Sequence, residues 1–437
     1  MSPAAGSTTP IETLPDPSAP GEQPRDPGPP LARAGPLSAF RAPLFLVFWL
    51  TIAPSLTGVW IRITAQGWLV YDLTESEFLL GLVSFCQAAP VLIASPIAGA
   101  LLDVIDRRKV LIAVQLTVAS AMAVLGTLVV TGVVEVWHVM VIAVINGTAS
   151  GFDWPARLSL VPSLVPREHL QSAVALNAAA FNGSRVIGPA IGGWLLATVG
   201  VGACFYLNAL AYIPFALALM LLPIGPTSPA PPDQRRTIRS LTANLNEGYR
   251  YIWRTPAIRG LLSVDVVPLM FGISYFTLAP AVARDVLGLG ERGLGVLLAC
   301  NGAGSLAGTI SVALLSGVRR RGRIVVTGVA LFGLTLFAFA LSDFLILSLL
   351  LILLLGLVNA TYGTFNDTLV QTLVDDNYRG RVLSVYSMLW GLTPIGGLLA
   401  GFLAQFLGVQ TALAINGVLI LAYVPYLLRG TPVASID

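Results

Sequence analysis

The chain has 437 residues, of which 55% are hydrophobic and 11% charged, and its mean hydropathy is +0.81. A soluble domain carries about 25% charged residues, so this chain lacks the charged surface that water would require. The composition excludes a cytosolic enzyme, a secreted disulfide scaffold and a nucleic-acid-binding module. It predicts an all-α integral membrane protein whose main solvent is the lipid bilayer.

Cysteine and histidine usage argues against disulfides and metal sites. The three cysteines, Cys86, Cys204 and Cys300, are dispersed through apolar runs, and His138 and His169 lie far apart in the sequence. The chain also has no Gly-x-x-x-x-Gly-Lys-Ser/Thr loop to cradle phosphates and no Ser/His/Asp set. We therefore expect a protein that is not an enzyme and that holds no metal or cofactor.

Residues 1–36 contain ten prolines and no apolar segment, so we expect a disordered cytoplasmic tail. Beyond this tail, twelve stretches approach the roughly 20 apolar residues that a membrane-spanning helix needs. A charged connector at 224–256 divides them into an N-terminal six-helix half at 40–223 and a C-terminal six-helix half at 257–428. The predicted transmembrane helices are 43–70, 78–102, 110–132, 138–163, 171–197, 202–223, 257–283, 292–315, 324–341, 344–373, 381–406 and 409–428.

The connector carries apolar residues at spacings of three and four from Ile238 to Ile252, followed by Trp253. This spacing predicts an amphipathic helix that lies on the cytoplasmic membrane surface and tethers the two halves.

The basic residues support this topology. With both termini in the cytoplasm, 20 of the 25 lysines and arginines fall on the cytoplasmic side, and only Arg284 and Arg292 fall outside. Basic clusters at 107–109 and 319–321 follow the second and eighth spans, 212 residues apart. The pattern predicts a multi-pass protein of a bacterial cytoplasmic membrane, built from two duplicated halves.

The loop after the second span carries the most specific local pattern, in which Gly99 and Asp103 precede Arg107 and Arg108. Asp103 lies at the inner end of a predicted helix, where the helix dipole already presents negative charge. Its carboxylate therefore needs a cation or a facing helix N-terminus, which fits a gate that pairs in one conformation and releases in another. The alternative is a solvated loop that only sets the topology.

This loop resembles the Gly-x-Leu-x-Asp signature, followed by arginines, between helices two and three of the major facilitator superfamily. Val104 replaces a commonly basic position and Asp106 the usual glycine. The resemblance covers residues 40–428 and points to the branch with enterobactin exporters and macrolide efflux proteins. It implies twelve helices and solute transport by alternating access. Three further stretches agree with this branch: 68–76, 152–168 and 185–193.

The fifth predicted helix contains Gly188, Pro189, Gly192 and Gly193. This run resembles the Gly-Pro-x-x-Gly-Gly signature of antiporters in the superfamily, which implies export. The alternative is a packing motif, because small residues let helices approach closely and proline allows a bend.

Five charged residues at membrane depth are functional candidates, because each costs at least about 2.5–3.5 kcal/mol on insertion scales. Asp153 and Arg157 are four residues apart and can pair, either as a structural gate or in coupling. Arg185, near the middle of its helix, could hold an anionic substrate or neutralise an acid. Asp265 could carry a proton or form a static ion pair. Arg62, in the outer third of its helix, could snorkel outward.

We therefore expect a monomeric secondary active transporter that exports small amphipathic molecules of the drug, macrolide or siderophore type by proton antiport. Its partners would be the substrate, protons as the coupling ion and the lipid bilayer, with no nucleic acid. Trp60, Tyr362, Tyr386 and Trp390 are candidates to line an aromatic cavity. One alternative is an importer of a nutrient or siderophore on the same fold, and another is a membrane receptor that does not transport.

The loop pattern generates a first prediction. Asp103→Asn should impair transport while membrane abundance stays near normal, because the change removes a state-selective ion pair and no core packing. Transport rates and immunoblots of membrane fractions measure the two quantities. Full transport activity in this variant would assign Asp103 to the topology-setting alternative.

Overall fold

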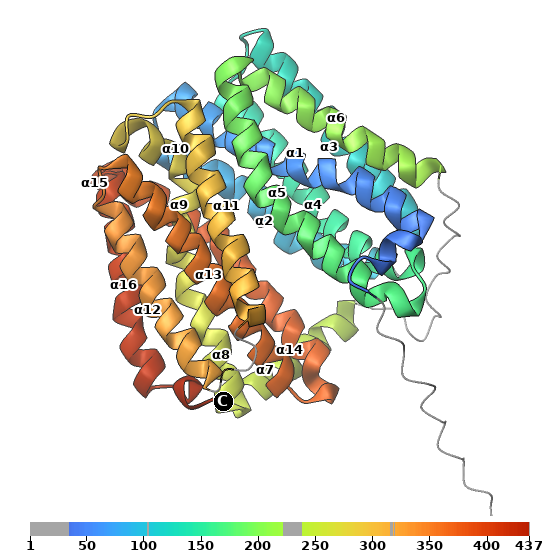
Figure 1. Ribbon diagram of the computed structural model, residues 1–437, viewed down its shortest axis with the longest axis vertical. Coiled ribbons are helices and arrows are strands. Elements are labelled where there is room, and N and C mark those ends of the chain that lie inside the picture. Colours follow the sequence, from blue (N-terminus) through green and yellow to red (C-terminus); the bar gives the residue numbers. More distant parts are fainter. Residues whose placement is uncertain (1–34, 103–104, 222–237, 315–317, 319, 437) are drawn as a thin grey trace, which may run out of the picture.

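The computed structural model describes residues 35–102, 105–221, 238–314, 318 and 320–436, and within these ranges the chain is helical with no β-strand (Figure 1). Helices satisfy their own backbone hydrogen bonds, which a lipid environment demands. Nine helices in the described part of the chain are long and apolar enough to cross a membrane. The predicted all-α membrane fold is therefore confirmed.

A first group of helices, blue to green in Figure 1, covers the predicted N-terminal half. In this group α1 contacts α5 and α6, α2 contacts α4, and α3 contacts α4 and α6. The members are α1 (Pro43–Thr74), α2 (Glu77–Leu101), α3 (Arg107–Val130), α4 (Val136–Leu164), α5 (Leu170–Thr198) and α6 (Val201–Leu221).

A second group, yellow to red in Figure 1, covers the predicted C-terminal half. Here α11 contacts α13, and α12 contacts both α13 and α16. The members are α8 (Pro256–Val267), α9 (Ser274–Thr277), α10 (Ala279–Ala281), α11 (Glu291–Leu314), α12 (Arg321–Ala340), α13 (Leu345–Leu373), α14 (Asp376–Met388), α15 (Thr393–Leu407) and α16 (Val409–Arg429).

Two spans predicted as single helices are interrupted. The segment predicted at 257–283 contains α8, α9 and α10, with π-helical turns at Pro268–Gly272 and Val282–Val286. The segment predicted at 381–406 breaks at a 3₁₀ turn, Leu389–Leu392, between α14 and α15. Prolines lie at each break or beside it, and a proline ring removes a backbone donor and opens the helical hydrogen-bond ladder.

The exact number of membrane crossings stays a prediction. Helices α4 and α5 and the α14–α15 segment coincide with predicted spans but are not among the nine described helices that meet the length and hydropathy requirement. The boundaries of the two halves stay a prediction as well. Residues 1–34 of the predicted tail lie outside the described residues, and so does Asp103.

The connector contains the predicted helix, α7 (Ile238–Arg254), and residues 222–237 of the connector lie outside the described residues. Helix α7 packs against α14: Tyr251 stacks on Tyr378 with ring centroids 4.5 Å apart, and Arg381 donates to Glu247 at 2.9 Å. These contacts anchor the connector to the second group. A position on the membrane surface remains a prediction.

The two groups meet mainly where α5 packs against α11 and α2 packs against α15. Gly193 of α5 faces Gly295 of α11 so closely that a Cβ on Gly193 would lie 2.5 Å from the Gly295 Cα. A Cβ on Gly81 of α2 would lie 2.7 Å from the carbonyl oxygen of Gly397 in α15. Side chains at these positions would push the two groups apart, so glycine permits the backbones to touch.

The topology can be tested with single cysteines in a variant lacking the three native ones. Val133, exposed between α3 and α4, is predicted to lie outside, and the exposed Ser435 is predicted to be cytoplasmic. Val133→Cys should react with an impermeant maleimide on intact cells, whereas Ser435→Cys should react only after permeabilisation. The opposite labelling pattern would overturn the orientation derived from the arginines.

Candidate functional site

Arg62 lies inside the first group. Its side chain does not extend outward toward the membrane surface, contrary to one prediction from the sequence. Its side chain is 4% exposed, and Nη1 donates to Oε1 of Gln66 and Oε1 of Gln87, both at 2.9 Å. Gln66 is four residues further along α1, so it shares a helix face with Arg62, and Gln87 comes from α2. The guanidinium is therefore held by amides inside the protein.

A cavity of about 200 Å³ adjoins this cluster. Gln66 and Gln87 form part of its wall, and the rest comes from α1, α2 and the α9–α11 region of the second group. The cavity thus lies between the two groups. Its remaining lining is largely apolar, with a few hydroxyl groups: Ile63, Thr64, Gly67, Val70, Leu80, Val83, Ser84, Ala88, Phe276, Thr277, Pro280, Leu294 and Leu298.

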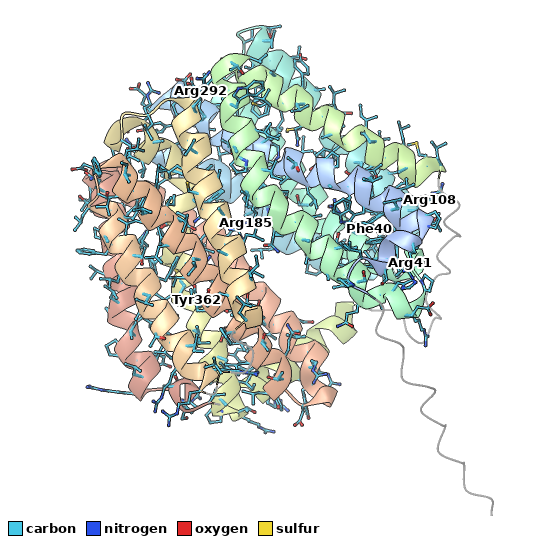
Figure 2. All side chains as sticks on the ribbon, in the orientation of Figure 1. Phe40, Arg41, Arg108, Arg185, Arg292 and Tyr362 are labelled. Carbon is cyan, nitrogen blue, oxygen red and sulfur yellow. The ribbon has the colours of Figure 1, made fainter. Side chains whose placement is uncertain are left out.

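Arg185 lies on α5 near the junction of the two groups (Figure 2). Its guanidinium carbon is 5.3 Å from the Trp60 ring centroid, a distance at which a cation is attracted to an aromatic face. Trp60 also packs edge-on against Phe181 and Phe276, with centroids 6.5 and 5.8 Å away. Within the described chain, no carboxylate pairs with Arg185, so the arrangement does not match a neutralised acid.

Asp265 lies in α8 and is 8% exposed. Its Oδ2 accepts a hydrogen bond from Nδ2 of Asn366 at 2.8 Å and lies 2.5 Å from the hydroxyl of Tyr386. The same hydroxyl lies 2.6 Å from Oδ1 of Asp367, an exposed residue of α13. No cation among the described residues pairs with Asp265, so the static ion pair considered from the sequence is absent there.

The other aromatic candidates occupy different surroundings. Tyr362 is 3% exposed and packs against Phe332, with ring centroids 5.9 Å apart, in the interior of the second group (Figure 2). It therefore does not line the cavity between the groups. The side chain of Trp390 lies outside the described part of the structure.

Asp153 and Arg157 pair on α4, as their spacing predicts, through Asp153 Oδ2 and Arg157 Nη2. Gln115 of α3 donates to Asp153 Oδ1 at 2.7 Å, and the Arg157 guanidinium carbon lies 5.4 Å from the Phe215 ring centroid on α6. The pair therefore connects α4 to α3 and α6. All of these contacts lie within the first group.

The described part of the Gly99–Arg108 loop fastens the start of α3 to its neighbours. Asp106 caps the helix by accepting from the backbone N–H of Arg108 at 3.0 Å. Arg107 donates to the carbonyl of Ser159 at 3.2 Å, and Arg108 donates to the carbonyl of Met220 at 2.7 Å. The two arginines thus bind the ends of α4 and α6. Asp103 itself lies outside the described residues, so its partner in a gate stays a prediction.

The helix-five motif holds α5 against two other helices. A Cβ on Gly188 would lie 2.5 Å from the Trp60 Cβ, and a Cβ on Gly192 would lie 3.3 Å from the Ile61 Cα, both on α1. Gly193 faces the second group, and α5 runs unbroken through Pro189. These contacts agree with the packing role, while a role in antiport stays a prediction.

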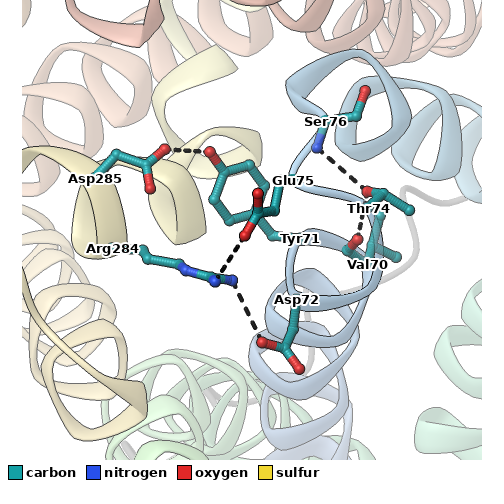
Figure 3. Close-up of polar contacts among 8 residues, drawn as sticks. All are labelled: Val70, Tyr71, Asp72, Thr74, Glu75, Ser76, Arg284 and Asp285. Atoms are coloured by element: carbon teal, nitrogen blue, oxygen red, sulfur yellow. Dashed lines mark hydrogen bonds and ion pairs between the residues drawn. The ribbon is translucent and has the colours of Figure 1, made fainter.

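A charged cluster joins the two groups where α1 ends, and we call Tyr71, Asp72, Glu75, Arg284 and Asp285 the latch (Figure 3). Arg284 donates to Asp72 at 3.3 Å and to Glu75 at 2.9 Å, and the Tyr71 hydroxyl donates to Asp285. Glu75 ends α1 with a left-handed φ of 49°, a conformation unfavourable for a non-glycine residue. The latch lies beside the cavity, since Val70 lines the cavity one residue before Tyr71.

The sequence did not reveal four features of the candidate site: Gln66, Gln87, Asp367 and the latch. A glutamine four residues after an intramembrane arginine is a signal that could have indicated Gln66. The predicted topology puts Arg284 on the same side as the acidic turn at 72–77, which could have indicated the latch. Asp367 lies inside the predicted span 344–373, and a charge there is a signal that could have indicated it. Gln87 carries no comparable local signal, because it meets Arg62 only through the fold.

Comparison with known proteins agrees with this architecture. Residues 34–433 match the family described as "Transmembrane secretion effector". The multidrug efflux pump Tap of Mycolicibacterium fortuitum is 30% identical over 384 residues, which cover 86% of this chain and 93% of that protein. The staphyloferrin A transporter of Staphylococcus aureus is 26% identical over 365 residues, covering 83% and 89%.

The solved structure of the nucleoside transporter NupG superposes with a TM-score of 0.67, covering 88% of this chain and 99% of that chain. Its sequence identity is 12%, so the likeness concerns the fold alone.

The latch generates a prediction about conformation. Arg284→Gln should favour opening of the interface beside the cavity, because it removes two exposed ion pairs worth together on the order of 1 kcal/mol, or about five-fold in population. A cysteine at Ser84, which lines the cavity, should then react faster with an impermeant maleimide added outside.

The matched control is Arg292→Gln at the start of α11, an exposed arginine outside the latch. Its labelling rate at Ser84→Cys should equal that of the parent protein. Equal rates for Arg284→Gln and the control would contradict a closing role for the latch.

Proposed function

Because the chain belongs to the transmembrane secretion effector family of the major facilitator superfamily, we propose that it exports small amphipathic molecules across a bacterial cytoplasmic membrane by proton antiport. Membership of this family establishes a multi-pass membrane transporter. The direction of transport, the coupling ion and the substrate class are what we propose. Export is supported by the efflux function in the name of Tap, the relative that is 30% identical.

The observation that carries proton coupling is the contact of one hydroxyl with two acids. The Tyr386 hydroxyl lies within 2.6 Å of oxygens from both Asp265 and Asp367. A phenol has one hydrogen and can donate it to only one carboxylate. The second contact is a hydrogen bond only when the other carboxyl group carries a proton and donates it to the phenol oxygen. The geometry therefore fits a cluster that holds one proton between two carboxyl groups.

Burial differs across this cluster in a way that suits a proton carrier. Asp367 is exposed, whereas Asp265 is 8% exposed and has the neutral groups of Asn366 and Tyr386 as its hydrogen-bond partners. Burial without a cation disfavours a charged carboxylate more than a neutral carboxyl group that is hydrogen-bonded. In this proposal Asp367 exchanges protons with water, and Tyr386 links it to Asp265.

Antiport requires that proton binding and substrate binding disfavour each other, by a coupling of about 1–3 kcal/mol. The proton cluster lies within the second group, and the cavity lies between the two groups. The two sites therefore communicate through the movement of one group against the other. In the described state, the latch holds the groups together at the end that we assign to the outside.

Import on the same fold is the second candidate. It is favoured by the two amides and three hydroxyl groups in the cavity lining. The name of the staphyloferrin A transporter fits a siderophore substrate in either direction. Inside-out and right-side-out vesicles with an imposed pH gradient separate the two directions.

The proton cluster generates a prediction. Asp265→Asn should abolish uphill efflux from proteoliposomes under an imposed pH gradient, because an amide cannot take up and release the coupling proton. Downhill exchange should remain measurable, since an amide of the same shape keeps the hydrogen bond from the Tyr386 hydroxyl.

The matched control is Asp343→Asn, an exposed acid that accepts from Gln410 at 2.6 Å. It should pump uphill at the wild-type rate. Undiminished uphill efflux by Asp265→Asn would make Asp265 structural, and a wild type that ignores the pH gradient would contradict proton coupling itself.

A further inference from the structure

The cluster of Arg62, Gln66 and Gln87 presents an unbalanced buried charge. Arg62 has two amide oxygens as partners, its Nε has none, and no carboxylate among the described residues lies within ion-pair distance of it. Burying a cation is expensive unless an anion or several hydrogen-bond acceptors compensate it. The resting protein compensates it in part, and a ligand anion would complete the compensation.

Arg62 also fixes the direction of the two amides. A glutamine amide has a carbonyl oxygen that accepts and an NH₂ group that donates. Because Arg62 holds both Oε1 atoms, the NH₂ groups must point elsewhere. Nε2 of Gln66 donates one of its two hydrogens to Oε1 of Gln87 at 3.4 Å, and Nε2 of Gln87 has no acceptor among the described residues. Both residues line the cavity, so its polar wall offers N–H donors with a positive charge behind them.

The rest of the cavity defines the other part of a ligand. Its apolar lining includes Val70, Val83, Phe276 and Leu294, and these side chains come from both groups. The volume of about 200 Å³ is below the usual range for a drug-sized ligand. The cavity therefore suits an acidic head group and a small apolar portion.

A second cation, Arg185 of α5, also lies near the junction of the two groups (Figure 2). Arg185 stacks on Trp60, which precedes Arg62 by two residues on α1, and no carboxylate in the described chain pairs with it. Two unpaired arginines near one interface attract anions and repel amines.

We propose that Arg62, Gln66 and Gln87 form a subsite for the carboxylate of an amphipathic substrate, with the amide N–H groups as donors and Arg62 as the balancing charge. This inference rests on the proposed transport function and names its substrate class. Arg62 acts partly as a positioning residue, since it turns the amides so that they donate into the cavity.

Binding to purified protein in detergent tests the subsite without any gradient. The probe is tritiated 1-naphthylacetate, and its uncharged analogue 1-naphthylacetamide serves as the competitor. Wild type should bind the acid at least about ten-fold more tightly than the amide, because hydrogen bonds to a charged group are stronger than those to a neutral one. Arg62→Gln should weaken acid binding about ten- to hundred-fold and change amide binding little.

Gln87→Glu provides a variant that keeps the fold, because its carboxylate can pair with Arg62. It should remove the preference for the acid, since the internal carboxylate takes the place of the ligand, and it should leave amide binding measurable. Arg292→Gln, an exposed arginine away from the cavity, is the control and should bind both compounds as wild type does. Size-exclusion elution establishes that each variant is folded.

The outcomes separate the subsite from the transport function. An acid preference that survives in folded Arg62→Gln or Gln87→Glu contradicts the subsite, as does a wild type that binds neither compound or binds both equally. An acid preference that depends on Arg62, in a protein without uphill efflux, supports the subsite and contradicts the proposed antiport. If the rate of uphill efflux is unchanged in Arg62→Gln, the result supports antiport and contradicts the subsite.

Discussion

A charge inside an apolar helix must find polar partners within the protein, and this constraint organises the interior of the molecule. Arg157 meets it with an acid on its own helix, and Asp265 meets it with hydrogen bonds from α13 and α14. Arg62 meets it only in part, with two amide oxygens and no acid among the described residues. A group with an oppositely charged partner holds helices together, whereas a group without one can bind a proton or a ligand.

Close backbone contact lets these sites act on one another. Gly193 against Gly295 and Gly81 against Gly397 bring the two helix groups together without intervening side chains. Such surfaces can slide or separate with little loss of interdigitated packing. The exposed ion pairs of Arg284 lie at the end of this interface, and ion pairs of that kind are weak enough to exchange during a transport cycle. A rigid interface of large side chains would resist that movement.

Prediction from the sequence succeeded where a property is local to the chain. Runs of apolar residues located the helices, and a spacing of four located the contact between Asp153 and Arg157. Breaks such as the one at Pro268 were missed because hydropathy is continuous through them. The partners of the functional groups could not be predicted either. Gln87 is 25 residues from Arg62, and Tyr386 is 121 residues from Asp265, so only the packing of the helices brings these side chains together.

In the proposed transport cycle, substrate binding and proton binding oppose each other across the two helix groups. The most direct test is proton release by purified protein in weakly buffered solution, followed with a pH indicator while 1-naphthylacetate is added. We predict release of up to about one proton per protein molecule, because substrate binding disfavours the proton shared by Asp265 and Asp367, and no release from Asp265→Asn. Saturating binding of the compound without proton release from the wild type would contradict the proposed cycle.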